Sequence, residues 1–197
     1  MNKLYVLMGK SCTGKDTVYK KLLENPRLNL KSFVSYTTRP IRTGETNGVE
    51  YHFLRSVDEI LKHKDNIIEI RKYDTKNGEW FYMTIDDGQI DFNTNHLTIG
   101  TLESYEKLRE YYGESKVVPL YVEVDDGIRL QRSLDREMGQ ENPKYKEMCR
   151  RYLADDKDFS EARLNELNIN KRFRNDKDVY ACLREIENTI LQEVSFK

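Results

Sequence analysis

Residues 4–24 read LYVLMGKSCTGKDTVYKKLLE. The apolar run Leu4–Met8 predicts a strand buried on both faces, as in a parallel sheet. Over Lys15–Glu24 apolar residues recur at helical spacing, and Asn25-Pro26 ends the pattern. A buried strand, a short loop and a helix in this order predict an α/β fold built on a parallel core sheet.

The loop between this strand and helix fits the phosphate-loop (P-loop) pattern G-x-x-x-x-G-K at residues 9–15. Its glycines let backbone N–H groups converge on an anion, and the helix directs the positive end of its dipole to the same place. Lys15 then reaches the outer phosphates of ATP. The alternative, a glycine-rich turn beside a solvated lysine, is disfavoured by the flanking strand and helix. The predicted ATP-binding residues here are Gly9, Lys10, Ser11, Cys12, Thr13, Gly14, Lys15, Asp16 and Thr17.

The residue after Lys15 departs from the pattern. A serine or threonine is expected there, because its hydroxyl binds Mg²⁺, but this chain has Asp16 followed by Thr17. One interpretation is that Asp16 contacts Mg²⁺ directly or through water, with Thr17 supporting the loop. The other is that Asp16 only stabilises the helix N-terminus. The sequence leaves both open.

The middle of the chain predicts a small antiparallel sheet. Lys31–Thr38 reads as a second strand, and Tyr51–Phe53 resumes extended structure. Ile67–Ile70 and Trp80–Thr84 are further strands separated by the hairpin signal Asn77-Gly78. Antiparallel hairpins need no crossover helices, so we expect a lobe inserted into the parallel core.

The last part of the chain predicts one more core strand and then helices. Val117–Val124 is apolar and strand-like. Helical patterns follow over residues 127–138, 143–157 and roughly 176–194, the last with one apolar face.

The composition disfavours several classes of function. Lys+Arg 33 against Asp+Glu 34 give a formal net charge of −1, so the chain lacks the basic field typical of duplex-binding proteins. No run approaches a membrane span, and the N-terminus lacks the features of a signal peptide. Cys12, Cys149 and Cys182 show no metal-ligand spacing and fit a reducing compartment. We therefore expect a cytoplasmic protein that binds neither nucleic acid nor a membrane, with its oligomeric state, monomer or dimer, left open.

The stretch SYTTRPIRTGETNGVEYHF, residues 35–53, predicts a second phosphate site. Arg39 and Arg42 can grip one phosphate from two sides, and Tyr51 offers a hydroxyl to it. An exposed charge cluster is the alternative. The stretch closely resembles the nucleotide-binding signature of guanylate kinases, S-x-T-T-R-x-x-R-x-G-E-x-x-G-x-x-Y-x-F, at every fixed position.

This resemblance implies an acceptor site for GMP. In the family the serine, both arginines and the tyrosine of the signature hold the GMP phosphate, and a glutamate after two apolar residues reads the guanine edge. A Tyr-Gly-Thr follows, whose tyrosine meets the phosphate and whose threonine meets the base. A carboxylate suits guanine because N1 and N2 carry N–H donors, and a hydroxyl can donate to O6. The GMP-binding residues implied here are Ser35, Arg39, Arg42, Tyr51, Glu69, Tyr82 and Thr84.

One family motif is lost. Guanylate kinases usually carry D-x-D-x-x-G after the lobe, and the corresponding residues here are Ile99 and Thr101. We hypothesise that Asp16 offsets the missing carboxylate from the opposite side of the site.

Arginines in the predicted helices are typical of a mobile lid. Arg129, Arg132 and Arg136 lie near one helical stripe, although a solvated charged helix is the alternative. By resemblance to the family, Arg132, Arg136 and Arg151 (or Arg150) close over the phosphates and Asn175 lies near the adenine. The stretch Asn170–Arg174 before it does not show a buried strand pattern.

Together these features predict an α/β P-loop NTPase-type parallel sheet with flanking helices, an inserted small mixed or antiparallel nucleotide-binding lobe and a helical lid. The expected parts of this single domain are a core (about 1–34, 93–126 and 158–197), a lobe (about 35–92) and a lid (about 127–157). The resemblance implies transfer of the γ-phosphoryl group of ATP to GMP or dGMP with Mg²⁺, the catalytic residues being Lys15, Arg39, Arg132, Arg136 and Arg151. The alternatives are a related P-loop kinase with another phosphorylated acceptor and a non-catalytic guanylate-kinase-like binding module.

Overall fold

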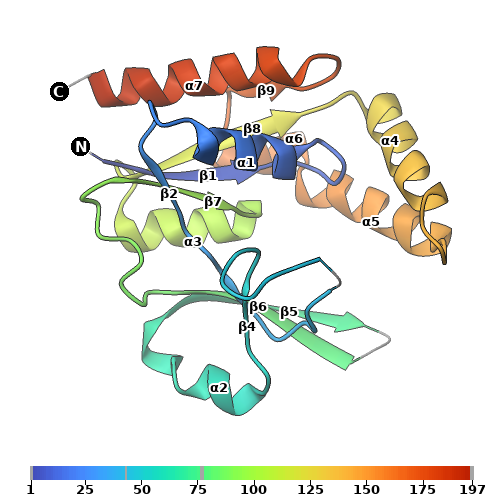
Figure 1. Ribbon diagram of the computed structural model, residues 1–197, viewed down its shortest axis with the longest axis horizontal. Helices are drawn as coiled ribbons and strands as arrows, with labels where there is room; N and C mark the ends of the chain where they lie inside the picture. The colour runs from blue at the N-terminus through green and yellow to red at the C-terminus, as the bar shows by residue number, and fades with distance from the viewer. Residues whose placement is uncertain (1, 43, 76–77, 196–197) are drawn as a thin grey trace.

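A five-stranded parallel sheet forms the centre of the molecule in a computed structural model, which describes residues 2–42, 44–75 and 78–195 (Figure 1). Every neighbouring pair in this sheet is parallel, which confirms the predicted α/β class. In the order in which they pair, the strands are β2 (Leu30–Ser32), β7 (Asn95–Ile99), β1 (Leu4–Met8), β8 (Val117–Glu123) and β9 (Arg172–Arg174).

Helices cover both faces of this sheet. Alternate residues of β1 point to opposite faces, and both sets are fully buried, as expected for a central parallel strand. One face packs against α1 (Lys15–Glu24) and α7 (Val179–Ser195). The other face packs against α3 (Leu102–Tyr112) and α6 (Glu161–Glu166).

A four-stranded mixed sheet forms the predicted lobe and lies below the parallel sheet in Figure 1. Only the pairing of β3 with β4 is parallel, and α2 (Val57–Leu61) with a short 3-10 helix, η1 (Lys64–Asn66), completes this part. A small core of Ile60, Met83 and Ile85 holds α2 to it. The strands, in spatial order, are β4 (His52–Phe53), β3 (Tyr36–Thr37), β6 (Gly78–Ile85) and β5 (Ile67–Thr75).

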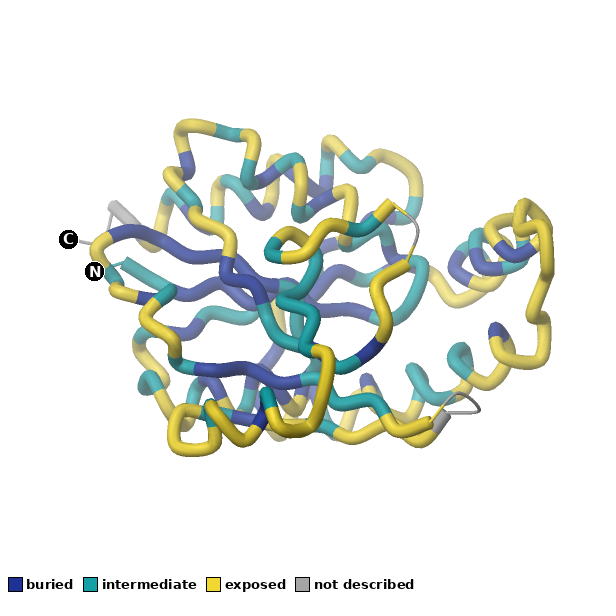
Figure 2. Tube along the Cα trace, turned by 60° about the horizontal axis from the view of Figure 1, so that its bottom comes forward, coloured by how far each residue is buried: buried dark blue, intermediate teal, exposed yellow. Residues whose placement is uncertain are grey.

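The predicted lid is a pair of helices, α4 (Asp126–Met138) and α5 (Tyr145–Asp158). In Figure 2 they extend from the buried strands at the centre of the molecule and are largely exposed. In the part of the chain that the structure describes, no helix is both long and apolar enough to span a bilayer.

Two strand predictions were wrong. Lys31–Thr38 is not one strand: β2 ends at Ser32, and the chain crosses to the other sheet, where β3 begins at Tyr36. Asn170–Arg174 does contain a strand, because β9 is an edge strand with Phe173 fully buried and its neighbours less so. Thr75 pairs with Gly78 across β5 and β6, and Asn77 of the predicted hairpin turn lies outside the described residues.

His96 on β7 makes stability depend on pH. Its side chain is buried, and burial lowers the pKa of the imidazole below its ordinary value. The unfolded chain then binds the proton more readily, so this contribution to the free energy of unfolding is complete above the unfolded pKa of 6.5 and is lost as pH falls through the folded value. Urea unfolding at pH 7.5 and pH 5.5 should show a larger loss of stability for the wild type than for His96→Leu, and an equal loss in both would contradict this.

Candidate functional site

The phosphate loop joins β1 to α1. At two of its glycines a side chain would clash with neighbouring atoms, and the backbone also has a positive φ. A Cβ on Gly9 would lie 2.3 Å from the carbonyl oxygen of Val122, and Gly9 has φ +153°. A Cβ on Gly14 would lie 2.6 Å from Nδ2 of Asn175, and Gly14 has φ +85° at the N-cap of α1. The loop therefore closes tightly against β8 and the segment after β9.

Lys15 lies inside this loop. Its Nζ donates to the carbonyl oxygens of Gly9 at 2.6 Å and Lys10 at 2.8 Å. Burial lowers the pKa of the Lys15 ammonium, partly offset by the nearby Asp16 and Asp155. A desolvated cation next to converging amides attracts an anion strongly, as expected for a group that binds phosphate.

Asn175 supports the loop from behind. Its buried Nδ2 donates to the carbonyl oxygen of Thr13 at 2.8 Å, and Arg132 Nη2 donates to the carbonyl oxygens of Asn175 and Asp176, each at 3.0 Å. The predicted adenine contact of Asn175 remains a prediction, but its side chain has a clear structural role in shaping the P-loop.

A carboxylate of α5 accepts a hydrogen bond from a backbone N–H of the phosphate loop, where a phosphate of ATP is expected to bind. The backbone N–H of Ser11 donates to Asp155 Oδ2 at 2.8 Å, and Lys10 Nζ donates to Asp156 Oδ1 at 2.7 Å. Both aspartates also bind Arg129, at 3.2 and 2.9 Å. The loop and the predicted lid are thus joined by ion pairs and one backbone hydrogen bond.

Arg129 is the centre of this junction. It is fully buried, its guanidinium lies 3.7 Å from the ring centroid of Tyr152, and it also pairs with Asp126 at 3.1 Å. A buried cation needs such partners, because desolvation without them is costly. Sequence reasoning placed Arg129 on the lid stripe but assigned it no role. The structure shows that it holds α4 to α5.

Asp155→Asn is expected to strengthen ATP binding. Asp155 places negative charge at an amide of the phosphate loop, so removing that charge should lower the Kd for ATP by about fivefold, corresponding to about 1 kcal/mol. Asp156→Asn is the matched control, because Asp156 also binds Arg129 but does not contact the loop amide. Titration calorimetry with ATP checks this, and weaker binding by Asp155→Asn alone would contradict it.

The predicted acceptor-phosphate residues gather around a buried guanidinium. Arg39 is 3% exposed, and it binds Glu45 with two hydrogen bonds of 2.9 and 3.0 Å. Its guanidinium lies 5.6 Å from the ring centroid of Tyr51, whose ring meets that of Tyr82 edge-on at 5.6 Å. Burial disfavours the Arg39 cation, but Glu45 outweighs this and raises its pKa.

The other two signature residues are less enclosed. Arg42 is exposed, and its backbone N–H donates to Glu45 Oε2 at 2.8 Å. Ser35 is half-buried and its carbonyl oxygen accepts from the N–H of His52 at 2.9 Å, which ties β3 to β4. The geometry thus brings Arg39, Tyr51 and Tyr82 together and leaves Arg42 at the edge. Thr43 of the signature lies outside the described residues.

The predicted base-reading residues form one hydrogen-bonded cluster. Thr84 Oγ1 donates to Glu69 Oε1 at 2.8 Å, and both side chains are buried. Arg71, two residues along β5, binds the same carboxylate from Nε at 2.9 Å and Nη2 at 3.2 Å. Its Nη1 donates to Thr101 Oγ1 at 3.1 Å. Sequence reasoning missed Arg71, although period-two spacing in a strand places it on the face of Glu69.

Thr101 and Ile99, which stand where the family has aspartates, have structural roles. Thr101 is the N-cap of α3 and forms a capping box with Ser104. Ile99 ends β7 and packs against the core that α1 and α7 cover.

The phosphate loop and the base-reading cluster lie at one edge of the parallel sheet. β1 and β7 are paired neighbours, so the P-loop and Thr101 both follow the carboxyl ends of adjacent strands. Arg71 reaches Thr101 from the lobe. Burial raises the pKa of the Tyr51 hydroxyl, and the nearby Tyr82 raises it further, partly offset by Arg71 and Arg39. Ligands of open α/β sheets bind at this carboxyl edge.

The lid arginines are not assembled into one cluster. Arg132 binds the carbonyl oxygens after β9, whereas Arg136 is exposed. Arg151 lies 3.8 Å from Glu147, and Arg150 pairs with Glu147 at 2.7 Å. Their predicted closure over phosphates therefore remains a prediction.

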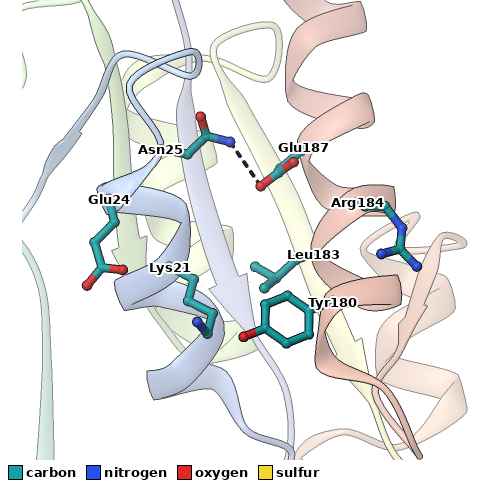
Figure 3. Close-up of a pocket in the computed structure, with 7 residues that line it drawn as sticks. All are labelled: Lys21, Glu24, Asn25, Tyr180, Leu183, Arg184 and Glu187. Atoms are coloured by element: carbon teal, nitrogen blue, oxygen red, sulfur yellow. Dashed lines mark hydrogen bonds between the residues drawn. The ribbon is translucent and has the colours of Figure 1, made fainter.

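Two hollows lie outside the acceptor residues. One of about 490 Å³ adjoins the P-loop and includes Lys10, Thr13, Asp126 and Asp156 in its lining. The other, of about 310 Å³, lies between α1 and α7 (Figure 3), where Asn25 donates to Glu187.

The three cysteines are free, and burial raises the pKa of Cys182 to about 12. Within residues 2–42, 44–75 and 78–195, no group of three or more His, Cys, Asp or Glu is arranged to hold a metal ion.

Comparisons with known proteins agree with this geometry. The family model described as guanylate kinase matches residues 1–97. Guanylate kinases from two strains of Thermus thermophilus are 43% identical over 72 residues, which is 36% of this chain and 32% or 31% of the relatives. The chain thus aligns with about a third of the length of these curated relatives.

A solved structure is similar over the whole chain. The crystal structure of guanylate kinase from Anaplasma phagocytophilum matches with a TM-score of 0.69 and 21% identity, covering 100% of this chain and 87% of that one. This match shows the fold. The sequence match over residues 1–97 shows that this part of the chain is similar to guanylate kinases.

Proposed function

We propose that this protein is a guanylate kinase, which transfers the γ-phosphoryl group of ATP to the phosphate of GMP or dGMP. The proposal is supported by the phosphate loop around Lys15, which follows β1 at the carboxyl edge of the sheet, and by the contact from the lobe to Thr101 after the neighbouring strand β7. The buried guanidinium of Arg39 in the same lobe supports the acceptor site. Phosphoryl transfer needs donor and acceptor phosphates held in line while developing charge is neutralised, and side chains of this kind do both.

The residues have distinct roles in this proposal. The loop amides and Lys15 hold the outer phosphates of ATP, while Arg39, Arg42, Ser35, Tyr51 and Tyr82 hold the GMP phosphate. Glu69 reads the guanine edge. Arg132, Arg136 and Arg151 on the lid approach the transferred group and exclude water when ATP and GMP are bound.

The side chains near the loop can supply only some of the ligands that Mg²⁺ needs. Asp16 is exposed in the first turn of α1, next to Thr17. Mg²⁺ commonly takes one or two carboxylates and completes its shell with substrate phosphates and water. Asp16, with support from Thr17, would hold the ion together with ATP, and the ion would supply charge neutralisation at the phosphates.

Asp16→Ala tests this metal role, because alanine, unlike serine, has no hydroxyl that could bind the ion in place of the carboxylate. We expect the variant to need several-fold more Mg²⁺ for half-maximal rate, because it lacks the carboxylate ligand. The measurement is the initial rate against free Mg²⁺ at fixed ATP. An unchanged Mg²⁺ dependence would leave Asp16 with only its helix-stabilising role.

A coupled assay of ADP release tests the proposed function. Purified protein is given ATP and each of GMP, dGMP, AMP, CMP and UMP, with and without Mg²⁺. We expect Mg²⁺-dependent turnover that is fastest with GMP or dGMP. Turnover with another acceptor only would favour the related-kinase alternative, and ATP binding without turnover would favour the non-catalytic module.

A further inference from the structure

The base-reading cluster contains a hydrogen-bond donor that the family signature does not assign. Thr84 is expected to donate to a guanine, but its hydroxyl carries a single proton, and Glu69 Oε1 accepts it at 2.8 Å. While that bond holds, Thr84 has no proton left for O6. The side chain of Arg71 also contacts Glu69.

Arg71 has donors to spare. Its hydrogen bonds to the Glu69 carboxylate use Nε–H and one N–H of Nη2, and its bond to Thr101 uses one N–H of Nη1. A guanidinium has five N–H groups, so one remains on each of the two Nη atoms.

The Arg71 side chain is also held in place. It is 13% exposed and is fixed between β5 of the lobe and Thr101, the N-cap of α3 in the core. Bidentate pairing with Glu69 fixes the plane of the guanidinium. A donor fixed in this way can contribute to selectivity, because little rotational freedom is lost when a base binds.

We propose that Arg71 determines base specificity by donating to O6 of the acceptor guanine while Glu69 accepts from N1–H. One lone pair of Glu69 Oε2 remains for that bond beside the three hydrogen bonds from Arg71 and Thr84. This inference rests on the proposed function, since it concerns the acceptor of that reaction. It makes the Arg71–Glu69 pair, and not Glu69 alone, the group that recognises the base.

The order of donor and acceptor in the pair explains the discrimination. The pairing edge of guanine presents an acceptor, O6, beside donors at N1 and N2. Adenine presents a donor at N6 beside an unprotonated N1, which is the reverse order. In a site where Thr101 fixes the Arg71 end of the pair, adenine would set donor against donor and acceptor against acceptor.

Three nucleotides and three variants test this. Calorimetry measures the Kd of GMP, IMP and 2-aminopurine ribonucleoside monophosphate, because IMP lacks the N2 amino group and the 2-aminopurine nucleotide lacks both O6 and the proton on N1. Arg71→Met should weaken GMP and IMP binding by about 10- to 100-fold, as for a lost charged hydrogen bond. Binding of the 2-aminopurine nucleotide should change by less than about threefold, because it has no O6 to lose.

Two further variants serve as controls. Thr84→Val removes the hydroxyl without removing the proposed O6 donor, so it should affect the three nucleotides alike. Arg71→Lys is the second variant, in case Arg71→Met fails to fold. Lysine keeps a positive charge beside Glu69, so the buried carboxylate still has a partner. The lysine loses the planar guanidinium, and we expect the same selective loss for GMP and IMP, but smaller.

The outcomes separate the two proposals. If Arg71→Met and Arg71→Lys weaken all three nucleotides equally, Arg71 only supports the lobe and the specificity proposal is wrong, while the guanylate kinase proposal stands. If the wild-type protein binds none of the three nucleotides and does not turn over GMP, the proposed function fails, and with it the role of Arg71.

Discussion

Replacing Lys15 with methionine is expected to lower kcat by about 10²–10³-fold or more, the scale seen when one charge-stabilising donor is lost from a transition state. The Lys15 ammonium donates to backbone carbonyl oxygens of its own loop, and burial lowers its pKa. The buried charge therefore lowers the stability of the folded protein when no phosphate is bound. Methionine fills similar space without the charge. Thermal stability should therefore stay the same or rise while turnover is lost.

Lys20→Met is the control for this prediction. Lys20 lies on the same helix and is exposed, so its loss should leave both kcat and the melting temperature nearly unchanged. Steady-state rates and thermal melts of the two variants provide the measurement. If Lys15→Met turned over ATP and GMP at a rate close to that of the wild type, Lys15 would not contact the transferred phosphate.

Replacing Arg39 with alanine is expected to lower kcat/KM for GMP by about 10²–10⁴-fold, the product of two charged hydrogen bonds worth about 1.5–3 kcal/mol each. Arg39 is buried, and its fork already binds Glu45, beside the ring of Tyr51. The variant loses the phosphate contacts and also leaves Glu45 without its main partner. ATP binding should be unaffected, because the P-loop is on another element.

Arg39→Lys separates charge from geometry. Lysine keeps the positive charge near Glu45 but cannot form the bidentate pair, so it should recover stability more than activity. Rates at varied GMP, together with the Kd for ATP, make the comparison. Equal loss of ATP and GMP binding in Arg39→Ala would mean that Arg39 acts through the fold and not at the acceptor.

Local sequence patterns predicted the elements whose burial they determine themselves. The run Leu4–Met8 is apolar at every position, and β1 has those bounds because it is the central strand, buried on both faces. α1 likewise begins at Lys15 and ends at Glu24, since Gly14 and Asn25-Pro26 mark its ends. These two elements position the phosphate loop.

Elements that depend on tertiary partners were harder to predict. β9 is polar at both ends, and only Phe173 points into the core, so its strand character comes from pairing with β8. The stretch 31–38 is continuous in sequence but divides between two sheets. α3 was not predicted, because Leu102–Ser104 was compared with a family motif that this chain lacks.

The site residues also divide into those that local sequence predicted and those that depend on tertiary contacts. Lys15 and Arg39 were found from short motifs whose chemistry is local. Arg71 and Asp155 were missed, because nothing in their immediate sequence indicates that one binds Glu69 and the other contacts the amide of Ser11. Such contacts depend on how β5 and α5 pack against the carboxyl edge of the parallel sheet.

The proposed phosphoryl transfer requires that two phosphate-binding groups face one cleft. Calorimetric titration with a bisubstrate ligand, adenosine and guanosine joined 5′ to 5′ through five phosphates, tests this most directly. We predict one ligand per chain, a Kd at least about 100-fold tighter than that of ATP, and weaker binding in both Lys15→Met and Arg39→Ala. Binding no tighter than that of ATP, or binding that Arg39→Ala leaves unchanged, would contradict a shared cleft.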